Sequence, residues 1–358
     1  MRSELLRHVT RIVVKLGTGI LTDEAKRPDW GQLTQLVAQV AGLRALGHEV
    51  VLVTSGAVGA GMGVLGFSKR PTTLAELQAC AAVGQSRLMA TYERLFEAHR
   101  LNVAQVLLTH DDLEHHERHL NARNTLVALL QRGVVPIINE NDAVSFTELR
   151  FGDNDKLSAL VACLLPADLL VILTTSEGLM ENFGTPNARL LTMVDAIDDR
   201  IVAMAGGTSS ATAVGGMATK IQAARIAVRA GIPLVIAPGR RATVLANIMA
   251  GQDEGTLFVP RPAKLKGRKR WIAFFHHPKG TLVVDEGARK ALRDRGTSLL
   301  VPGIARHEGS FSEGDVVRIC DLEGTEFARG KARIGATDLS AEPRRRREVV
   351  HRDDLVML

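Results

Sequence analysis

The first two thirds of the chain alternate short, continuous apolar runs with longer amphipathic segments. The clearest amphipathic segment covers residues 33–46, where Leu and Val recur at helical spacing and Gly47 follows as the expected C-terminal residue. Continuous apolar runs separated by helices predict an α/β fold, with an open, mostly parallel sheet sandwiched between helices. The predicted strands are residues 12–16, 50–54, 103–108, 134–138, 169–173 and 234–236.

A different pattern begins near residue 278. Short alternating runs at 281–284, 316–320 and 349–350 are separated by Gly-containing turns, which predicts a small, mainly β domain. The segment in front of it is basic and weakly patterned, as expected of a linker. We therefore predict a first domain at residues 1–260, a basic linker at 261–277 and a second domain at 278–358.

Composition narrows the class of protein. A chain of 358 residues suits two domains, and its hydrophobic fraction of 46% and charged fraction of 23% are typical of soluble globular proteins. No apolar stretch approaches the length of a membrane span, and we expect no membrane association and a cytoplasmic location. The three cysteines form no C-x-x-C pair, which argues against disulfides and zinc and favours small buried side chains: Cys80, Cys163 and Cys320.

The positive charge is concentrated in the C-terminal part. From Arg261 to the end the chain carries 21 Lys and Arg and 14 Asp and Glu, so this part accounts for the whole net charge of +6. The arginine run at 344–347 is compatible with a nucleic-acid contact and equally with a solvated loop.

Two polar clusters are the most informative local feature. Residues 139–142 (Asn-Glu-Asn-Asp) follow a predicted strand, and residues 153–155 (Asp-Asn-Asp) precede a predicted helix. Open α/β sheets bind ligands where strands end and helices begin. So many carboxylates and amides predict a site for a small, charged, amine-bearing ligand, although 153–155 taken alone fits a plain helix cap.

Three glycine-containing loops predict binding of an anion. They are residues 15–19 (KLGTG), 54–63 (TSGAVGAGMG) and 215–220 (GGMATK). Glycine allows several backbone N–H groups to approach one anion, and Lys15 and Lys220 add positive charge. Each lysine also has an ordinary explanation, as a solvated strand end or a first-turn residue. Together the loops favour phosphoryl transfer, which depends on positioning and charge neutralisation.

Two further motifs, at residues 61–66 and 115–119, are weaker evidence of function. No Walker A sequence is present, and the G-x-G-x-x-G at Gly61, Gly63 and Gly66 follows the second strand, so a dinucleotide site is disfavoured. His115 and His119 have metal-ligand spacing, but their charged neighbours favour a solvated helix.

Several motifs together resemble the glutamate 5-kinase family of the amino acid kinase superfamily, in its long form with a C-terminal PUA domain. They are VVKLGTGILT, VTSGAVGAG, AAVGQSRLMA, LNARNTL, VPIINENDAV, GDNDKLSA, GGMATK and VVHRDDLV. The resemblance implies an amino acid kinase fold for residues 1–260 and a PUA-like fold for 278–358.

The resemblance also assigns roles to residues of this chain. It implies that Lys15, Lys220 and Asp155 are catalytic, with Asp155 holding the lysines. It implies that Ser55, Asp142 and Asn154 bind glutamate, with Asp142 facing the ammonium and the other two the carboxylates. The implied ATP-binding residues are Lys15, Gly17, Thr174, Thr175, Val214, Gly215, Gly216, Met217, Ala218, Thr219 and Lys220.

The implied reaction is ATP-dependent phosphorylation of the γ-carboxylate of L-glutamate, the first step of proline biosynthesis. This carboxylate is ionised at pH 7, so it needs no strong general base. The implied metal is Mg²⁺, held mostly by nucleotide phosphates and water without a protein metal site. Feedback inhibition by proline and a homo-oligomer, dimer or tetramer, are further implications.

The chain departs from the family pattern on the nucleotide side. Thr175 stands for the usual Asp, Met180 for Tyr and Ala213–Val214 for Gly-Thr, which affects expected nucleotide affinity. Two alternatives stay open. One is a kinase of aspartate, carbamate, N-acetylglutamate or a nucleotide, against which Asp142 argues because carbamate and N-acetylglutamate lack an ammonium. The other is an RNA-binding protein acting through the PUA-like domain.

Overall fold

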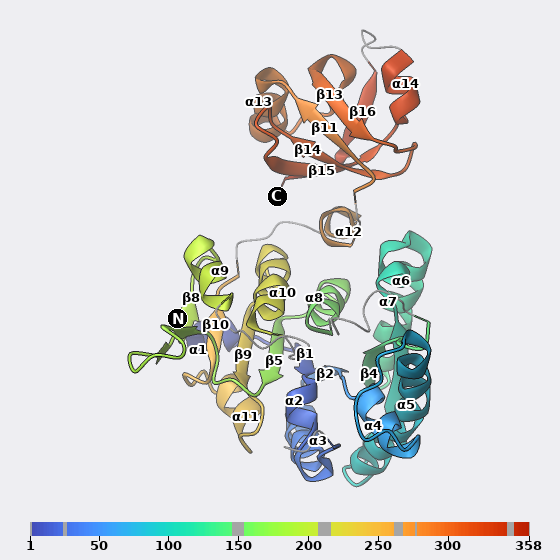
Figure 1. Ribbon diagram of the computed structural model, residues 1–358. Helices are drawn as coiled ribbons and strands as arrows, with labels where there is room; N and C mark the ends of the chain where they lie inside the picture. Colours follow the sequence, from blue (N-terminus) through green and yellow to red (C-terminus); the bar gives the residue numbers. More distant parts are fainter. Residues whose placement is uncertain are drawn as a thin grey trace. The chain divides into compact units, whose positions relative to one another are not determined.

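The computed structural model describes residues 2–23, 27–144, 154–206, 216–260, 268–275, 278–341 and 347–357. The chain divides into two compact units, Met1–Ala263 and Lys264–Leu358 (Figure 1). Each unit has its own hydrophobic core.

The described part of the first unit contains an eight-stranded sheet in the order β3-β4-β2-β1-β5-β9-β10-β8. Neighbouring strands from β3 to β9 are parallel, and β10 pairs antiparallel with β9. Two further short strands form a separate hairpin, β6-β7. The strands are β1 (Arg11–Leu16), β2 (Glu49–Val53), β3 (Val103–Leu108), β4 (Val135–Glu140), β5 (Leu169–Thr174), β6 (Met180–Glu181), β7 (Arg189–Leu190), β8 (Met193–Val194), β9 (Leu234–Pro238) and β10 (Thr256–Phe258).

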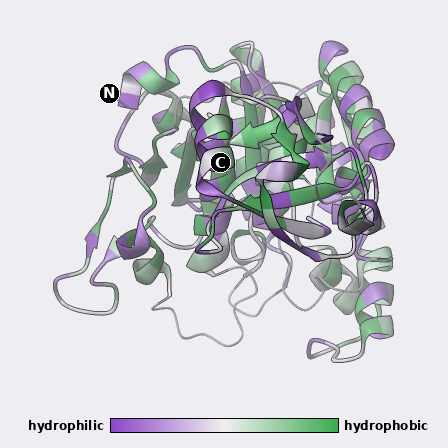
Figure 2. Cartoon of the chain, turned by 90° about the horizontal axis from the view of Figure 1, so that it is seen from above, coloured by the Kyte–Doolittle hydropathy of each residue, from purple (hydrophilic) through white to green (hydrophobic). Residues whose placement is uncertain are grey.

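Helices cover both faces of this sheet (Figure 1). They are α1 (Arg2–Leu6), α2 (Thr18–Leu21), α3 (Trp30–Ala45), α4 (Ala57–Val64), α5 (Leu74–Glu97), α6 (His110–Glu114), α7 (His116–Gln131), α8 (Asn154–Leu164), α9 (Asp199–Ala205), α10 (Met217–Arg229) and α11 (Val244–Met249). Among the described residues, no helix combines the length and the apolar character needed to cross a membrane. Figure 2 shows that the strands are mostly hydrophobic, whereas the helices carry both kinds of residue.

The pleat of β1 decides which side chain reaches the functional face. Ile12, Val14 and Leu16 belong to the core that contains α3, so they point to one face of the sheet. Successive side chains of a strand point to opposite faces. Lys15 therefore projects to the other face, where α8 packs across the central strands.

The second unit contains a six-stranded sheet in its described part, in the order β12-β16-β15-β14-β11-β13. The strands are β11 (Gly280–Val284), β12 (Leu299–Leu300), β13 (Ile304–Gly309), β14 (Val316–Cys320), β15 (Glu326–Ala332) and β16 (Glu348–Met357). The helices are α12 (Arg268–Phe274), α13 (Glu286–Arg295) and α14 (Ala336–Ala341), with a 3-10 turn, η1 (Val301–Gly303). Helix α12 lies inside the range 261–277 and packs on β15 and β16.

The fold class expected from the apolar pattern is confirmed. Each predicted strand of the first unit is present, and its ends move by at most two residues. Helix α3 ends where Gly47 adopts φ +90°, as the pattern indicated. The prediction of small buried cysteines is also confirmed, because Cys80, Cys163 and Cys320 are all buried free thiols.

Candidate active site

The candidate residues gather where the parallel strands end. From β1 the chain proceeds to β2 on one side, whereas β5 and β9 lie on the other, so the strand order reverses between β1 and β5. Open α/β sheets place their ligands at such a reversal, beyond the carboxyl ends of the strands. Lys15 lies near the end of β1, and Thr174 is the last residue of β5.

A buried carboxylate between two lysines forms the centre of the site. Lys15 Nζ lies 2.7 Å from Asp155 Oδ1, and Lys220 Nζ lies 3.2 Å from Asp155 Oδ2. The exposed fractions of Lys15, Asp155 and Lys220 are 4%, 1% and 5%. Burial by itself raises the pKa of the Asp155 carboxyl, but Lys15 and Lys220 outweigh it and lower the pKa to about 2. The carboxylate is therefore ionised at neutral pH, and the trio has a net charge of +1.

The first turn of α10 contributes Thr219 and Lys220 to this centre. Thr219 Oγ1 donates to Asp155 Oδ2 at 2.7 Å, and Lys220 is the next residue. A lysine in a first helical turn is disfavoured by the helix dipole, and its charge is costly to bury without a partner. Asp155 supplies that partner. The backbone N–H groups at the start of α10 and the two ammonium groups together make this region suited to an anion.

The loop after β1 lies against the end of β5. Gly17 N–H donates to the Leu173 carbonyl at 3.3 Å, and a Cβ on Gly17 would lie 3.4 Å from Lys15 Nζ. A Cβ on Gly19 would lie 3.0 Å from Thr175 Cγ2. This close approach brings the predicted phosphate loop beside two predicted nucleotide residues, Thr174 and Thr175.

The predicted nucleotide residues fall into two groups. Thr174 is half-buried and Thr175 is exposed, both beside the loop that contains Gly17. The first turn of α10 carries Gly216, Met217, Ala218, Thr219 and Lys220. Val214 and Gly215 lie outside the described residues, as do Ala213 and the polar residue Asp153.

The predicted substrate residues Ser55 and Asn154 are in contact. Asn154 Nδ2 lies 2.9 Å from the Thr54 carbonyl oxygen and 3.0 Å from Ser55 Oγ. Asn154 is adjacent in the chain to Asp155, so the start of α8 joins the lysine centre to the amide cluster. Asp142 lies in the turn after β4, partly exposed, where its N–H donates to the Glu140 carbonyl at 2.9 Å.

The buried side-chain amides of Asn139 and Gln85 complete this cluster. The sequence motifs assigned no role to either residue. Asn139 Oδ1 accepts from Asn154 Nδ2 at 3.1 Å, and Asn139 Nδ2 donates to Gln85 Oε1 at 2.9 Å. Asn139 belongs to the polar run 139–142, and Gln85 to the motif AAVGQSRLMA. These motifs marked the segments, but nothing in them indicated that the two side chains meet.

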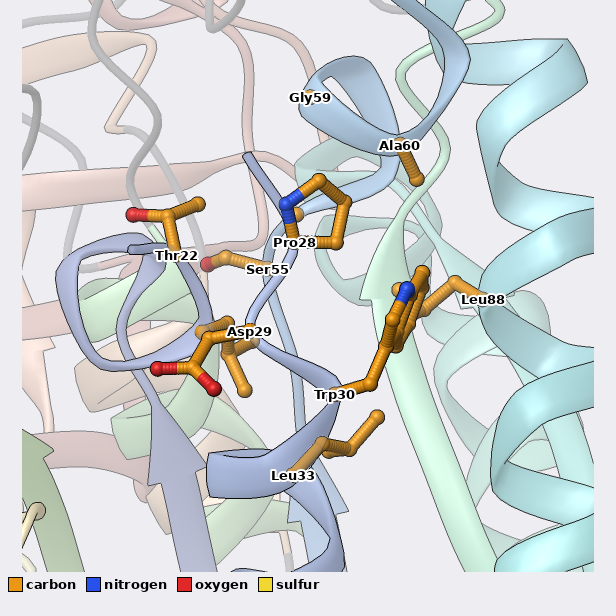
Figure 3. A pocket seen from close by; sticks show the side chains of 11 residues that line it. Thr22, Pro28, Asp29, Trp30, Leu33, Ser55, Gly59, Ala60 and Leu88 are labelled. Carbon is orange, nitrogen blue, oxygen red and sulfur yellow. The ribbon is translucent and has the colours of Figure 1, made fainter. Parts of the chain in front are cut away.

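A pocket adjoins Ser55 and Gly56. Figure 3 shows Ser55 beside Pro28 and Asp29, with Trp30 on the opposite side of the cavity. Gly56 has φ +105°, a left-handed conformation that favours glycine at the start of α4. The pocket provides open space next to a predicted substrate residue.

The histidine-rich segment is a solvated helix, as expected, except at His119. His119 is buried, and its Nδ1 lies 3.2 Å from the Leu113 carbonyl oxygen. Burial lowers the pKa of His119 to about 4, so the ring is neutral at pH 7. Among the described residues, no cluster of three or more His, Cys, Asp or Glu could hold a metal ion.

Comparison with known proteins agrees with this geometry. The chain matches the amino acid kinase family over residues 10–238 and the PUA domain over residues 280–351. It is 48% identical over 373 residues to the glutamate 5-kinase of Geobacter sp. (strain M21), with full coverage of both chains. The chain belongs to the glutamate 5-kinase family. Another member, from Pelobacter propionicus, is 44% identical over 373 residues, again with full coverage of both.

A more distant solved structure matches the fold of this glutamate 5-kinase family member. The carbamate kinase from Giardia lamblia, bound to AMP-PNP, has a TM-score of 0.52 and 18% sequence identity. The match covers 71% of this chain and 99% of the carbamate kinase. The glutamate 5-kinases are an enzyme family of phosphotransferases, and this chain combines the amino acid kinase domain with a PUA domain.

Proposed function

We propose that the protein transfers the γ-phosphoryl group of ATP to the γ-carboxylate of L-glutamate, forming γ-glutamyl phosphate and ADP in the first step of proline biosynthesis. One observation carries the proposal. Asp155 organises two buried lysines, and its neighbour Asn154 contacts Ser55, so phosphate-binding and acceptor-binding groups share the start of α8.

The two lysines act on the phosphates. Lys15 and Lys220 approach from β1 and α10, with Asp155 fixing both ammonium groups. Backbone N–H groups near Gly17 and at the start of α10 stabilise oxygens of the transferring group. Such preorganised donors are the main contribution to catalysis of phosphoryl transfer.

The acceptor is bound by Ser55, Asn154 and Asp142. The Asp142 carboxylate pairs with the substrate ammonium. The γ-carboxylate of glutamate is ionised at pH 7 and attacks the γ-phosphorus of ATP. The bond between that phosphorus and the β,γ-bridging oxygen breaks, and ADP leaves, so no proton needs to be removed from the nucleophile.

Magnesium accompanies the nucleotide in this proposal. The Asp155 oxygens are engaged by Lys15, Lys220 and Thr219. Mg²⁺ would be held mostly by phosphate oxygens and water, and it would supply additional charge neutralisation.

Nucleotide recognition involves Thr174, Thr175 and residues 214–220. Thr175 replaces the usual carboxylate, and its exposed hydroxyl is a weaker acceptor than a carboxylate. We therefore infer weaker nucleotide binding than in relatives that carry an acidic residue there. Feedback inhibition by proline and assembly into a dimer or tetramer are further proposals, based on the family resemblance.

Trapping the acyl phosphate tests the proposed function. The full-length protein is incubated with ATP, Mg²⁺, hydroxylamine and glutamate, and γ-glutamyl hydroxamate is measured. Aspartate, N-acetylglutamate and carbamate are tested in parallel, with acceptor-dependent release of ADP as a second readout. We expect hydroxamate and ADP release with glutamate. Acceptor-dependent ADP release with another compound but not with glutamate would replace the proposed substrate.

A further inference from the structure

The side-chain amides of Asn154, Asn139 and Gln85 form an amide row, and a backbone carbonyl fixes the orientation of these amides. Asn154 Nδ2 lies 2.9 Å from the Thr54 carbonyl oxygen, which can only accept, so this end of the Asn154 amide is the NH₂ group. The NH₂ also faces Asn139 Oδ1 at 3.1 Å, and Asn139 Nδ2 in turn donates to Gln85 Oε1 at 2.9 Å. Each amide is thereby oriented by its neighbour, beginning at Thr54.

This direction determines which atom of Asn154 remains for a ligand. The NH₂ group has two protons, and three protein oxygens lie within 3.1 Å of it. The nitrogen therefore has no proton left for a substrate carboxylate. Asn154 Oδ1 is buried and has no hydrogen-bond donor among the described residues. A buried acceptor of this kind requires a donor, and the ammonium of an amino acid is one.

We propose that Asn154 Oδ1 accepts a hydrogen bond from the substrate ammonium, and that Gln85 is the positioning residue that keeps this oxygen facing the substrate. The inference rests on the proposed function and changes the expected role of Asn154 from carboxylate to ammonium binding. Asp142 supplies the negative charge that pairs with the ammonium, and Asn154 Oδ1 supplies the hydrogen-bond acceptor that orients it. The site thereby selects acids with a free α-ammonium over deaminated or N-acylated analogues.

Gln85 can act in this way because the row of amides is closed to water. Gln85 is 8% exposed and Asn139 is 1% exposed. Without Gln85 Oε1, the Asn139 amide loses the acceptor that fixes its orientation. Rotation of Asn139 would then turn its own NH₂ toward Asn154 and remove one of the contacts that hold Asn154.

Three variants separate positioning from general stability. Gln85→Met removes the acceptor at similar volume. Gln85→Glu keeps an oxygen for Asn139, and its second oxygen replaces Nε2, which has no partner among the described residues. Gln32→Met is the matched control, because Gln32 is equally buried and its Nε2 donates to the Gly239 carbonyl at 2.8 Å, outside the amide row.

The measurements are KM and kcat for glutamate and the inhibition constant of glutarate, which has both carboxylates but no ammonium. We expect Gln85→Met to raise KM for glutamate about tenfold, the effect of one weakened hydrogen bond to a charged group. The glutarate constant and kcat stay within about threefold, and Gln85→Glu and Gln32→Met keep a KM near that of the wild type.

Two results would overturn the inference. One is an equal loss of glutamate and glutarate affinity in Gln85→Met, which would mean a general distortion of the site. The other is a Gln85→Met enzyme with unchanged KM for glutamate. Failure of the proposed function is distinct from both, because the wild type would then form no γ-glutamyl hydroxamate.

Discussion

Among single residues, Asp155 is the centre of the proposed active site. A buried carboxylate without partners would be protonated, and two buried ammonium groups without a carboxylate would repel each other. Together the three groups form a cluster in which the Asp155 carboxylate offsets one of the two ammonium charges. The same cluster presents excess positive charge to a phosphate.

The first prediction concerns this cluster. We expect Asp155→Asn to lower kcat at least about 100-fold, because the lysines lose the charge that orients them, while Asn can still accept from Thr219. Lys220→Ala should lower kcat similarly. Both should lose turnover much more than folding stability, as measured by circular dichroism and urea unfolding. A near-normal kcat in either folded variant would contradict the assigned roles.

The second prediction concerns His119 and pH. Its pKa in the folded protein is about 4, below the ordinary value near 6.5, so the unfolded chain binds the proton more readily. The contribution of neutral His119 to the free energy of unfolding is fully present above pH 6.5 and is lost progressively as pH falls toward 4. Urea unfolding midpoints at several pH values should therefore fall less steeply for His119→Gln than for the wild type. His116→Gln, on an exposed position of the same helix, is the control and should follow the wild type. Identical slopes for His119→Gln and wild type would refute the assignment.

At the scale of elements, two glycines allow α4 and α5 to approach closely. A Cβ on Gly84 would lie 1.8 Å from the Ala57 carbonyl oxygen, and one on Gly61 would lie 1.8 Å from the Cys80 carbonyl oxygen. Real side chains do not tolerate such distances, so larger residues would push the helices apart. Ser55 lies just before Gly56, the N-cap of α4, and this packing therefore also positions a proposed substrate residue.

The third prediction follows from this packing. Gly84→Ala should destabilise the protein by about 1–3 kcal/mol, typical of overpacking, and raise KM for glutamate. Gly63→Ala on the same helix α4 has nothing within 4 Å of its added Cβ. It should leave KM unchanged and stability equal or higher by about 0.5–1 kcal/mol. Thermal unfolding and glutamate titration measure both effects, and equal behaviour of the two variants would contradict the packing argument.

Elements with strong periodicity could be predicted from the sequence, whereas others could not. The strands of the first unit are continuous apolar runs, and α3 has a regular apolar face. Helix α13 was missed because Leu292 is its one fully buried residue among the ten of the segment. The amide row was missed because Gln85 and Asn139 are 54 positions apart, and only the fold brings them together.

At the scale of the whole molecule, every proposed catalytic or substrate residue belongs to the unit Met1–Ala263. The second unit has its own sheet and core. The sequence could predict this division because the apolar pattern changes near residue 278 and the net positive charge is concentrated after residue 260. It could not assign a role to the second unit.

The fourth prediction therefore concerns truncation. A chain of residues 1–263 should keep kcat within about threefold of the full-length enzyme, since no reacting group is removed. Steady-state kinetics measure this directly. Loss of turnover in a folded truncation would show that the PUA domain contributes to the active site.

A salt-dependent titration of residues 264–358 with RNA tests the alternative role of RNA binding, and absence of binding at low salt would exclude it.

In the proposed reaction, the γ-carboxylate of glutamate attacks phosphorus at the lysine–carboxylate centre. Its most direct test uses glutamate with both γ-carboxylate oxygens labelled with ¹⁸O, together with ATP, Mg²⁺ and hydroxylamine. One labelled oxygen bridges carbon and phosphorus in the product. Hydroxylamine attacks the carbonyl carbon and releases phosphate with that oxygen. Mass spectrometry should find one ¹⁸O atom in each glutamate-dependent phosphate, and Asp155→Asn should form such phosphate at least about 100-fold more slowly. Unlabelled phosphate alone would show hydrolysis of ATP by water and contradict the account.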